Sequence, residues 1–229
     1  MGEDNGMEIT LAIIGTAGRE DDEKKLTRDS FKAMCLVGEE LLKQLSDSNY
    51  AVTHAVSGGA AWADHVAVKL FLEKKVPHLR LFIPCEFEDG MFVDKLALRV
   101  ALPAANDTAY TPGKTLNHYH NLFSRKTCIN SLTEIVLAKN EGAEILPCRG
   151  GFYGRNAMVA KSDIVLAMTF GEKNMVKDGG TADTVRRYLA RVDKEGFFNK
   201  SFHYNLTDGK IYPTITAPPP QEKKKPFRR

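Results

Sequence analysis

The chain has 229 residues, of which 43% are hydrophobic, and a formal net charge of +3 at pH 7. This length and composition suit one large globular domain that buries a full core without disulfides or metals. No apolar run reaches the roughly 18–20 residues that a membrane span requires. The polar, acidic residues 1–7 differ from a secretory signal. We therefore expect a cytoplasmic protein with a short flexible N-terminus and no membrane partner.

The four cysteines indicate the same compartment. Cys35, Cys85, Cys128 and Cys148 are far apart in the sequence, and none forms a C-x-x-C pair. This spacing is atypical of a disulfide framework or a zinc site, and favours reduced thiols. We expect neither a metal nor a cofactor.

The positive charge is concentrated at the C-terminus. Residues 221–229 contain five basic side chains and one acidic side chain, so the preceding 220 residues are near neutral. Because a groove that grips many phosphates makes the domain itself basic, nucleic acid is expected to bind only through this tail, if at all. Residues 213–229 are Pro-rich and then basic, and we predict that they are disordered.

Apolar runs and amphipathic stretches alternate in the first part of the chain. Strands are predicted over residues 8–14, 50–56 and 79–83, and helices over 27–45 and 60–75. Gly15 follows the first strand, and Ser57-Gly58-Gly59 follows the second. The order strand-helix-strand-helix-strand predicts a Rossmann-like α/β fold: a doubly wound, mainly parallel sheet with helices on both faces.

The rest of the chain is less regular. Residues 85–113 carry no clear pattern, and residues 114–140 have helical spacing, so we interpret 85–140 as an insertion or lid plus a helix inside one domain spanning 8–212. The remaining predicted elements are a helix over 152–161, a strand over 164–168, a helix over 181–194 and a last, peripheral strand over 197–206.

The first candidate ligand-binding segment is Gly15-Thr16-Ala17-Gly18-Arg19, directly after the first predicted strand. Glycines allow a tight turn there, and exposed N–H groups favour an anion. Arg19 would add a charge-assisted contact. The segment is neither G-x-G-x-x-G nor a Walker A loop, so it is a weak signal by itself.

Three further segments follow in the sequence. Ser57, Gly58 and Gly59 follow the second strand and lead to Asp64, a candidate for binding ligand hydroxyls or phosphate. Arg155 and Asn156 precede the strand at 164–168. Because the carboxyl ends of parallel strands share one edge of a sheet, we expect these segments to converge there. The last segment, at a predicted helix start, contains Gly179, Gly180 and Thr181, which would bind a phosphate.

In this order the four segments resemble the SLOG superfamily, which includes the Lonely Guy and DNA-processing protein A families. S-G-G-A-A-W-A-D is similar to the family pattern S-G-G-A-x-G-x-D, and G-R-N-A-M-V-A-K-S-D-I-V-L-A resembles its R-N helix and the strand that follows. D-G-G-T-A-D-T looks like a shortened P-G-G-x-G-T-x-x-E loop. The resemblance covers about residues 9–75 and 145–193. It implies a Rossmann-like fold, a nucleotide-type ligand and a homo-oligomer, often a dimer.

The resemblance also implies a catalytic arginine at Arg155, because Lonely Guy enzymes hydrolyse the N-glycosidic bond of nucleoside monophosphates with an arginine and a glutamate. The glutamate of that pattern falls on Thr184, which has no carboxylate. Asp183, Asp178 or Glu134 is a possible substitute. A carboxylate matters because cleavage of this bond develops positive charge on the sugar.

Three functions stay open: a nucleotide N-glycosidase or a related nucleotide hydrolase or transferase, a non-catalytic sensor of a nucleotide-derived signal, and a single-stranded DNA-binding protein. We favour the enzyme. The expected catalytic residues are Arg155, Asp183 and Glu134. The expected ligand-binding residues are Gly15, Thr16, Ala17, Gly18, Arg19, Ser57, Gly58, Gly59, Asp64, Asn156, Gly179, Gly180, Thr181 and Thr184.

Overall fold

The computed structural model describes residues 6–95, 111–195 and 200–220. The strands are β1 (Met7–Gly15), β2 (Tyr50–Ser57), β3 (His78–Ile83), β4 (Glu86–Glu88), β5 (Met91–Val93), β6 (Glu144–Pro147), β7 (Ile164–Thr169), β8 (Ser201–Asn205) and β9 (Lys210–Pro213). The helices are α1 (Asp21–Lys25), α2 (Arg28–Asp47), the short 3-10 helix η1 (Trp62–Asp64), α3 (His65–Leu72), α5 (Pro112–Thr127), α6 (Ser131–Asn140), α7 (Gly151–Val159) and α8 (Gly180–Glu195).

Seven strands form the central sheet, in the order β6-β3-β2-β1-β7-β8-β9. All neighbouring pairs are parallel except β8 and β9, which are antiparallel. The chain runs outward from β1 through β2, β3 and β6, and then returns to place β7 on the other side of β1. The fold is therefore Rossmann-like, as predicted, and its topological switch point lies between β1 and β7.

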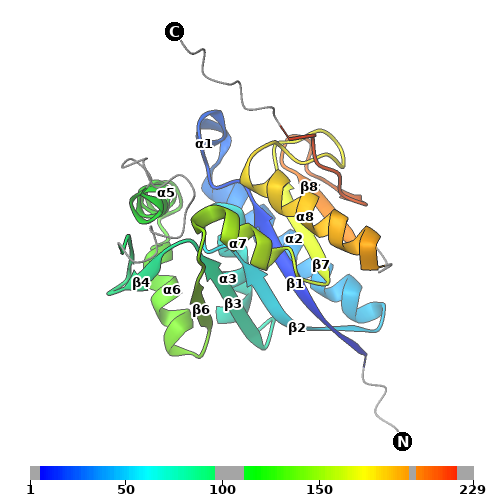
Figure 1. The fold of residues 1–229 in the computed structure, drawn as a ribbon, viewed down its shortest axis with the longest axis horizontal. Coiled ribbons are helices and arrows are strands. Elements are labelled where there is room, and N and C mark those ends of the chain that lie inside the picture. The colour runs from blue at the N-terminus through cyan, green and yellow to red at the C-terminus, as the bar shows by residue number, and fades with distance from the viewer. Residues whose placement is uncertain (1–5, 96–110, 196–199, 221–229) are drawn as a thin grey trace, which may run out of the picture.

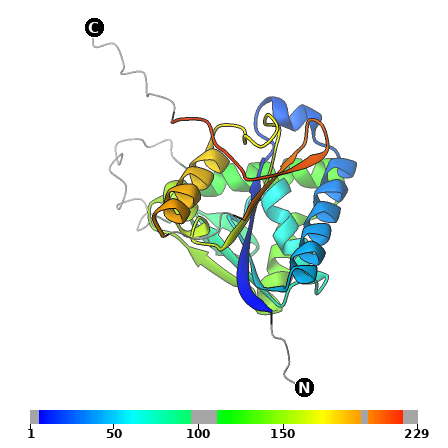
Figure 2. The same cartoon turned by 90° about the vertical axis from the view of Figure 1, so that its right-hand side faces the viewer.

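Helices cover both faces of the sheet, as Figures 1 and 2 show. Leu11 and Ile13 of β1 belong to the core cluster beneath α2, α3, α5 and α6. Ala12 and Ile14 point to the opposite face and join the cluster beneath α7 and α8. This alternation follows from the two-residue period of a strand, and a strand buried on both faces is apolar throughout, as β1 and β7 are.

Local sequence explains how α2 begins. The Thr27 hydroxyl accepts the backbone N–H of Ser30, and the Ser30 hydroxyl accepts the N–H of Thr27. This reciprocal pair satisfies N–H groups that have no partner inside the helix. Phe31, Met34 and Leu41 then recur at helical spacing and are buried against the sheet.

In the described residues, the segment 85–140 is not the expected insertion or lid. Residues 86–93 form the β4–β5 hairpin, and α5 and α6 pack into the main core through Leu116, Phe123 and Ile135. These helices are the crossover connection from β3 to β6. The sequence did not reveal β6 because it is an edge strand whose side chains are mostly exposed. Residues 96–110 lie outside the described residues.

The C-terminal prediction is corrected as well. Residues 213–220 are not a loose tail: β9 pairs with β8, and Ile215 is only 1% exposed. The main-chain carbonyl of Thr216 accepts the N–H of Val176 at 3.0 Å, and Arg186 donates to the Pro218 carbonyl. The predicted last strand is therefore β8, inside the sheet, and the edge strand is β9. Residues 1–5 and 221–229 lie outside the described part of the chain.

Several smaller elements also differ from expectation. The short helix α1 was not predicted, and β1 already begins at Met7. The helix expected at 60–75 is shorter and begins with the η1 turn.

Within the described ranges, no helix has the length and apolar character that a membrane crossing needs.

Candidate functional site

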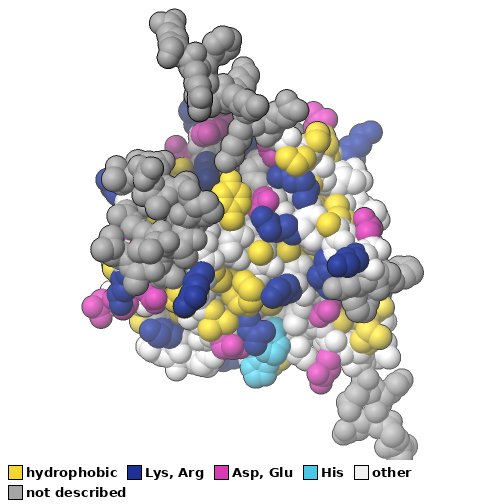
Figure 3. Space-filling view, viewed as in Figure 1, with side chains coloured by type: hydrophobic (Ala, Val, Ile, Leu, Met, Phe, Trp, Pro, Cys, Tyr) yellow, Lys and Arg dark blue, Asp and Glu magenta, His cyan; other side chains and the backbone are white. Residues whose placement is uncertain are grey.

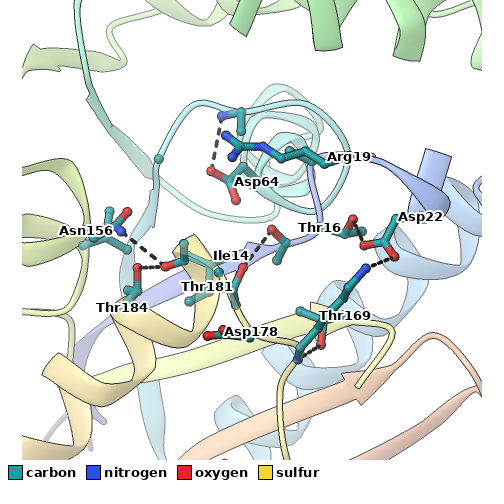
Figure 4. Close-up of a pocket in the computed structure, with 18 of the residues that line it drawn as sticks. Ile14, Thr16, Arg19, Asp22, Asp64, Asn156, Thr169, Asp178, Thr181 and Thr184 are labelled. Carbon is teal, nitrogen blue, oxygen red and sulfur yellow. Dashed lines mark hydrogen bonds and ion pairs between the residues drawn. The ribbon is translucent and has the colours of Figure 1, made fainter. Parts of the chain in front are cut away.

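A cavity of about 220 Å³ opens at the switch point, where β1 and β7 end. Figure 4 shows it between the loops that follow these strands and the start of α8. Open α/β sheets bind their ligands at this position. The lining residues are Ile14, Gly15, Thr16, Ala17, Arg19, Glu20, Asp22, Gly58, Ala60, Asp64, Arg155, Asn156, Val159, Thr169, Lys177, Asp178, Gly179, Gly180, Thr181 and Thr184.

Asp64 supplies a buried carboxylate to this cavity. Its side chain accepts the backbone N–H of Ala60 at 3.2 Å, and the Ser57 hydroxyl donates to its main-chain carbonyl at 3.1 Å. Burial raises the pKa of the Asp64 carboxyl, while the nearby Arg155 guanidinium and backbone N–H groups lower it. Burial dominates, so this group holds a proton more readily than an exposed aspartate.

Arg155 lies across Gly58 from Asp64. A β-carbon built on Gly58 would be 2.7 Å from Asp64 Oδ2 and 3.0 Å from Arg155 Nε, so both side chains press against one glycine. Arg155 Nη2 also donates to Asn156 Oδ1 at 2.9 Å. The lack of a side chain at residue 58 therefore lets a carboxylate and a guanidinium meet beside the cavity.

The start of α8 forms the opposite wall, with Thr181 and Thr184 across the cavity from Asp64 in Figure 4. The Thr181 hydroxyl donates to the Gly15 carbonyl at 2.9 Å, which joins α8 to the end of β1. Asn156 Nδ2 donates to the Gly180 carbonyl at 3.3 Å. The positive end of the helix dipole is thus held against the cavity, where it favours an anion.

A charged contact joins the other two loops. Lys177 Nζ pairs with Asp22 Oδ1 at 2.7 Å, and Asp22 Oδ2 accepts the Thr16 hydroxyl at 2.9 Å. The backbone N–H of Lys177 donates to the Thr169 hydroxyl at 3.0 Å. These contacts tie the segment after β7 to the loop after β1. The sequence patterns did not single out Asp22, Thr169 or Lys177. Thr169 directly follows the predicted strand at 164–168, and Lys177 lies just before the fourth glycine segment.

Three predicted ligand residues support the loops rather than line the cavity. Gly18 has φ +77°, and a β-carbon there would lie 2.7 Å from Trp62 Nε1. Ser57 is fully buried, and the Gly59 carbonyl contacts His120 Nε2 at 3.1 Å. The other eleven expected ligand residues all line the cavity, as does Arg155.

Two expected catalytic carboxylates are not brought to the cavity. Glu134 lies on α6 and contacts His65 Nε2 at 2.7 Å and Lys69 Nζ at 3.1 Å. Its place is beside α3 on the main-core side of the sheet. Asp183 accepts a hydrogen bond from Asn156 Nδ2 and forms an ion pair with Arg187. It therefore helps to orient the Asn156 side chain without lining the cavity. Of the substitutes for the missing glutamate at Thr184, only Asp178 lines the cavity.

The Gly58 contact leads to a stability prediction. Gly58→Ala should lower the free energy of unfolding by about 1–3 kcal/mol, because the new methyl overpacks Asp64 and Arg155. Gly180→Ala is the matched control, since a β-carbon there would lie 3.7 Å from Arg155 Nη2, an ordinary van der Waals distance. Urea unfolding of both variants measures the difference. Equal stability of the two would contradict the close approach of Asp64 and Arg155.

The surface in Figure 3 shows basic, acidic and apolar side chains interspersed over α7 and α8, with no continuous basic stripe on this face. That distribution gives no support to the DNA-binding alternative. Within residues 6–95, 111–195 and 200–220, no group of three or more His, Cys, Asp or Glu side chains is arranged to hold a metal ion.

Fold and cavity together define a Rossmann-like α/β protein with a cleft at its switch point. The chain is 38% identical over 182 residues to "Uncharacterized protein R261" of Acanthamoeba polyphaga mimivirus, covering 77% of this chain and 88% of that protein. It belongs to the same family as that viral protein. No family model matches the chain.

Proposed function

We propose that this protein binds a nucleotide or nucleotide-derived ligand in the cleft at the switch point. The observation that carries the proposal is the convergence of four sequence-distant segments, those of Gly15, Gly58, Arg155 and Gly180, on one cavity. A helix start and a guanidinium favour an anionic group, and a buried carboxylate accepts hydrogen bonds from sugar hydroxyls.

The resemblance to the SLOG superfamily supports the same ligand class. Each of the four segments that carry the resemblance contributes residues to the cavity lining, among them Thr16, Asp64, Arg155, Asn156 and Thr181. The sequence differs from the Lonely Guy pattern at Thr184, which has no carboxylate. In the structure Thr184 is buried at the cavity wall, and its hydroxyl donates to the Gly180 carbonyl. Binding is thus better supported than the particular reaction of those enzymes.

Calorimetry with the four common ribonucleoside monophosphates, ribose 5-phosphate and ADP-ribose tests binding. Fluorescence of Trp62, the one tryptophan in the sequence, is a second readout because Gly18 of the first loop packs on its indole ring. Binding of none of these compounds would overturn the proposal.

Arg155→Ala should weaken this binding about tenfold to a hundredfold, the effect of losing one charge-assisted hydrogen bond. Arg80→Ala is the control, because Arg80 pairs with Glu144 at 2.7 Å where β3 and β6 begin, at the opposite end of the sheet. Both affinities are measured by calorimetry. If the two variants bound equally well, Arg155 would not be a ligand residue.

Hydrolysis of an N-glycosidic bond is the second candidate function, and the approach of both Asp64 and Arg155 to Gly58 favours it. In the hydrolysis, the oxygen of a water molecule forms a bond to C1′ of the sugar. The C1′–N bond breaks, and its electron pair leaves with the nucleobase. Asp64 would take the water proton, and the base nitrogen gains a proton. Chromatography detects the free base. Asp64→Asn should abolish release while retaining binding; binding without release by the wild type would leave a sensor.

A further inference from the structure

Two aromatic rings and two guanidinium groups lie close to one another beside the cleft. The Arg19 guanidinium carbon lies 5.5 Å from the ring centroid of Tyr119 and 5.5 Å from that of Phe152. The Arg155 guanidinium carbon lies 5.0 Å from the same Phe152 ring. We call Tyr119, Arg19, Phe152 and Arg155 the stacked array. Its distances are those of favourable cation–π contacts.

The array joins parts of the chain that are far apart in sequence. Tyr119 comes from α5, Arg19 from the loop after β1, and Phe152 and Arg155 from α7. Both aromatic rings pack against the main core, which holds them in place. Arg19 and Arg155 line the cavity. Two core-anchored rings therefore orient the planar guanidinium of Arg19 beside the opening.

Charge pairing does not account for the position of Arg19. Among the residues that the structure describes, no carboxylate forms an ion pair with it, although Glu20 and Asp22 are its near neighbours in sequence. The side chain is exposed and yet lies over two rings. A guanidinium plane in this setting is a surface on which another flat, aromatic group stacks.

The size of the cavity points to the same use of Arg19. Sites that enclose drug-sized ligands have volumes of about 300–1,000 Å³. This cavity, at about 220 Å³, encloses only part of a nucleotide. If the sugar and phosphate lie inside, between Asp64 and the start of α8, the base extends past the mouth, where Arg19 lies.

We propose that the stacked array is a nucleobase subsite, in which the base of the ligand stacks on the Arg19 guanidinium backed by Tyr119 and Phe152. This inference rests on the proposed function and specifies its ligand class: a sugar phosphate that carries a heteroaromatic base. The array contributes stacking rather than base-edge hydrogen bonds, so it accepts more than one base.

Calorimetry with ribonucleoside monophosphates and with ribose 5-phosphate tests the subsite, because the two differ by the base. The wild type should bind the tightest monophosphate about tenfold or more tightly than ribose 5-phosphate, the scale of one stacked base. Arg19→Ala and Arg19→Lys should both remove this preference by weakening the monophosphate alone, since lysine keeps the charge but has no plane.

Lys25→Ala is the matched control, because Lys25 also lies over an aromatic ring, 5.1 Å from that of Phe170, but does not line the cavity. Its preference should equal that of the wild type. If both compounds bind the wild type equally, or if the Arg19 variants weaken both alike, the subsite is overturned while the proposed function stands. If neither compound nor ADP-ribose binds, both inferences are overturned.

Discussion

Replacing Phe123 with alanine should lower the free energy of unfolding by about 3–5 kcal/mol, the range for removing a buried aromatic ring. Phe123 is 0% exposed. Its ring meets those of Phe31 and Trp62 edge to face, with centroids 4.8 Å and 4.9 Å away, and lies 5.5 Å from the His65 ring. One side chain of α5 thus contacts α2, η1 and α3.

The effect should extend to the cleft. Trp62 supports Gly18 of the first loop, so the loss of its partner ring should loosen that loop. Urea unfolding of Phe123→Ala, with Tyr153→Ala as the control for an aromatic residue that is 61% exposed, measures the energy. The control should change stability by about 0.5 kcal/mol or less. Similar losses in both variants would mean that α5 is a loosely attached lid and not part of the core.

Acidification from pH 7 to 4.5 should cost about 2–3 kcal/mol of stability through His120 alone. His120 is fully buried, with Nδ1 2.9 Å from the Ser131 hydroxyl and Nε2 3.1 Å from the Gly59 carbonyl. Burial lowers the pKa of His120 to about 3, and the nearby His65 adds to the shift. Its ordinary pKa is 6.5, so between these two values the unfolded chain binds a proton that the folded chain excludes.

Stability therefore falls as pH decreases through 6.5 and continues to fall toward 3. Burial also lowers the pKa of His65 and His203, which adds to the loss, whereas the raised pKa of Asp64 opposes it. Comparison with His120→Gln isolates the His120 contribution, because the glutamine amide does not titrate and can still donate to the Gly59 carbonyl. Urea unfolding at several pH values gives the pH dependence of the free energy of unfolding for the wild type and for His120→Gln. Parallel curves would contradict a neutral, buried His120.

His120 also shows how the crossover helices bear on the site. Through Gly59 it fixes the loop that contains Gly58, on which Asp64 and Arg155 meet. The sequence places His118 and His120 around Tyr119, but it contains no indication that His120 points into the core toward the second glycine segment. That contact depends on how α5 packs against the loop after β2, which is decided by tertiary packing.

Local sequence was sufficient to predict the Rossmann-like fold and most of the candidate site. Buried parallel strands are continuous apolar runs, and glycines must follow them where the chain turns tightly, so β1, β2, β3 and β7 are visible in the sequence. Because parallel strands end at one edge, the convergence of Gly15, Gly58 and Gly180 also follows from the order of elements.

Tertiary structure decided the remainder. β6 is an exposed edge strand that carries little apolar signal, so the path from β3 through α5 and α6 could not be distinguished from an insertion. Ile215 reads as part of a Pro-rich tail, yet it is buried because β9 pairs with β8. Glu134 and Asp64 are both carboxylates on predicted helices, but only Asp64 reaches the cavity. A sequence pattern records which residues favour burial or a turn, whereas the neighbours of a side chain depend on how distant elements pack.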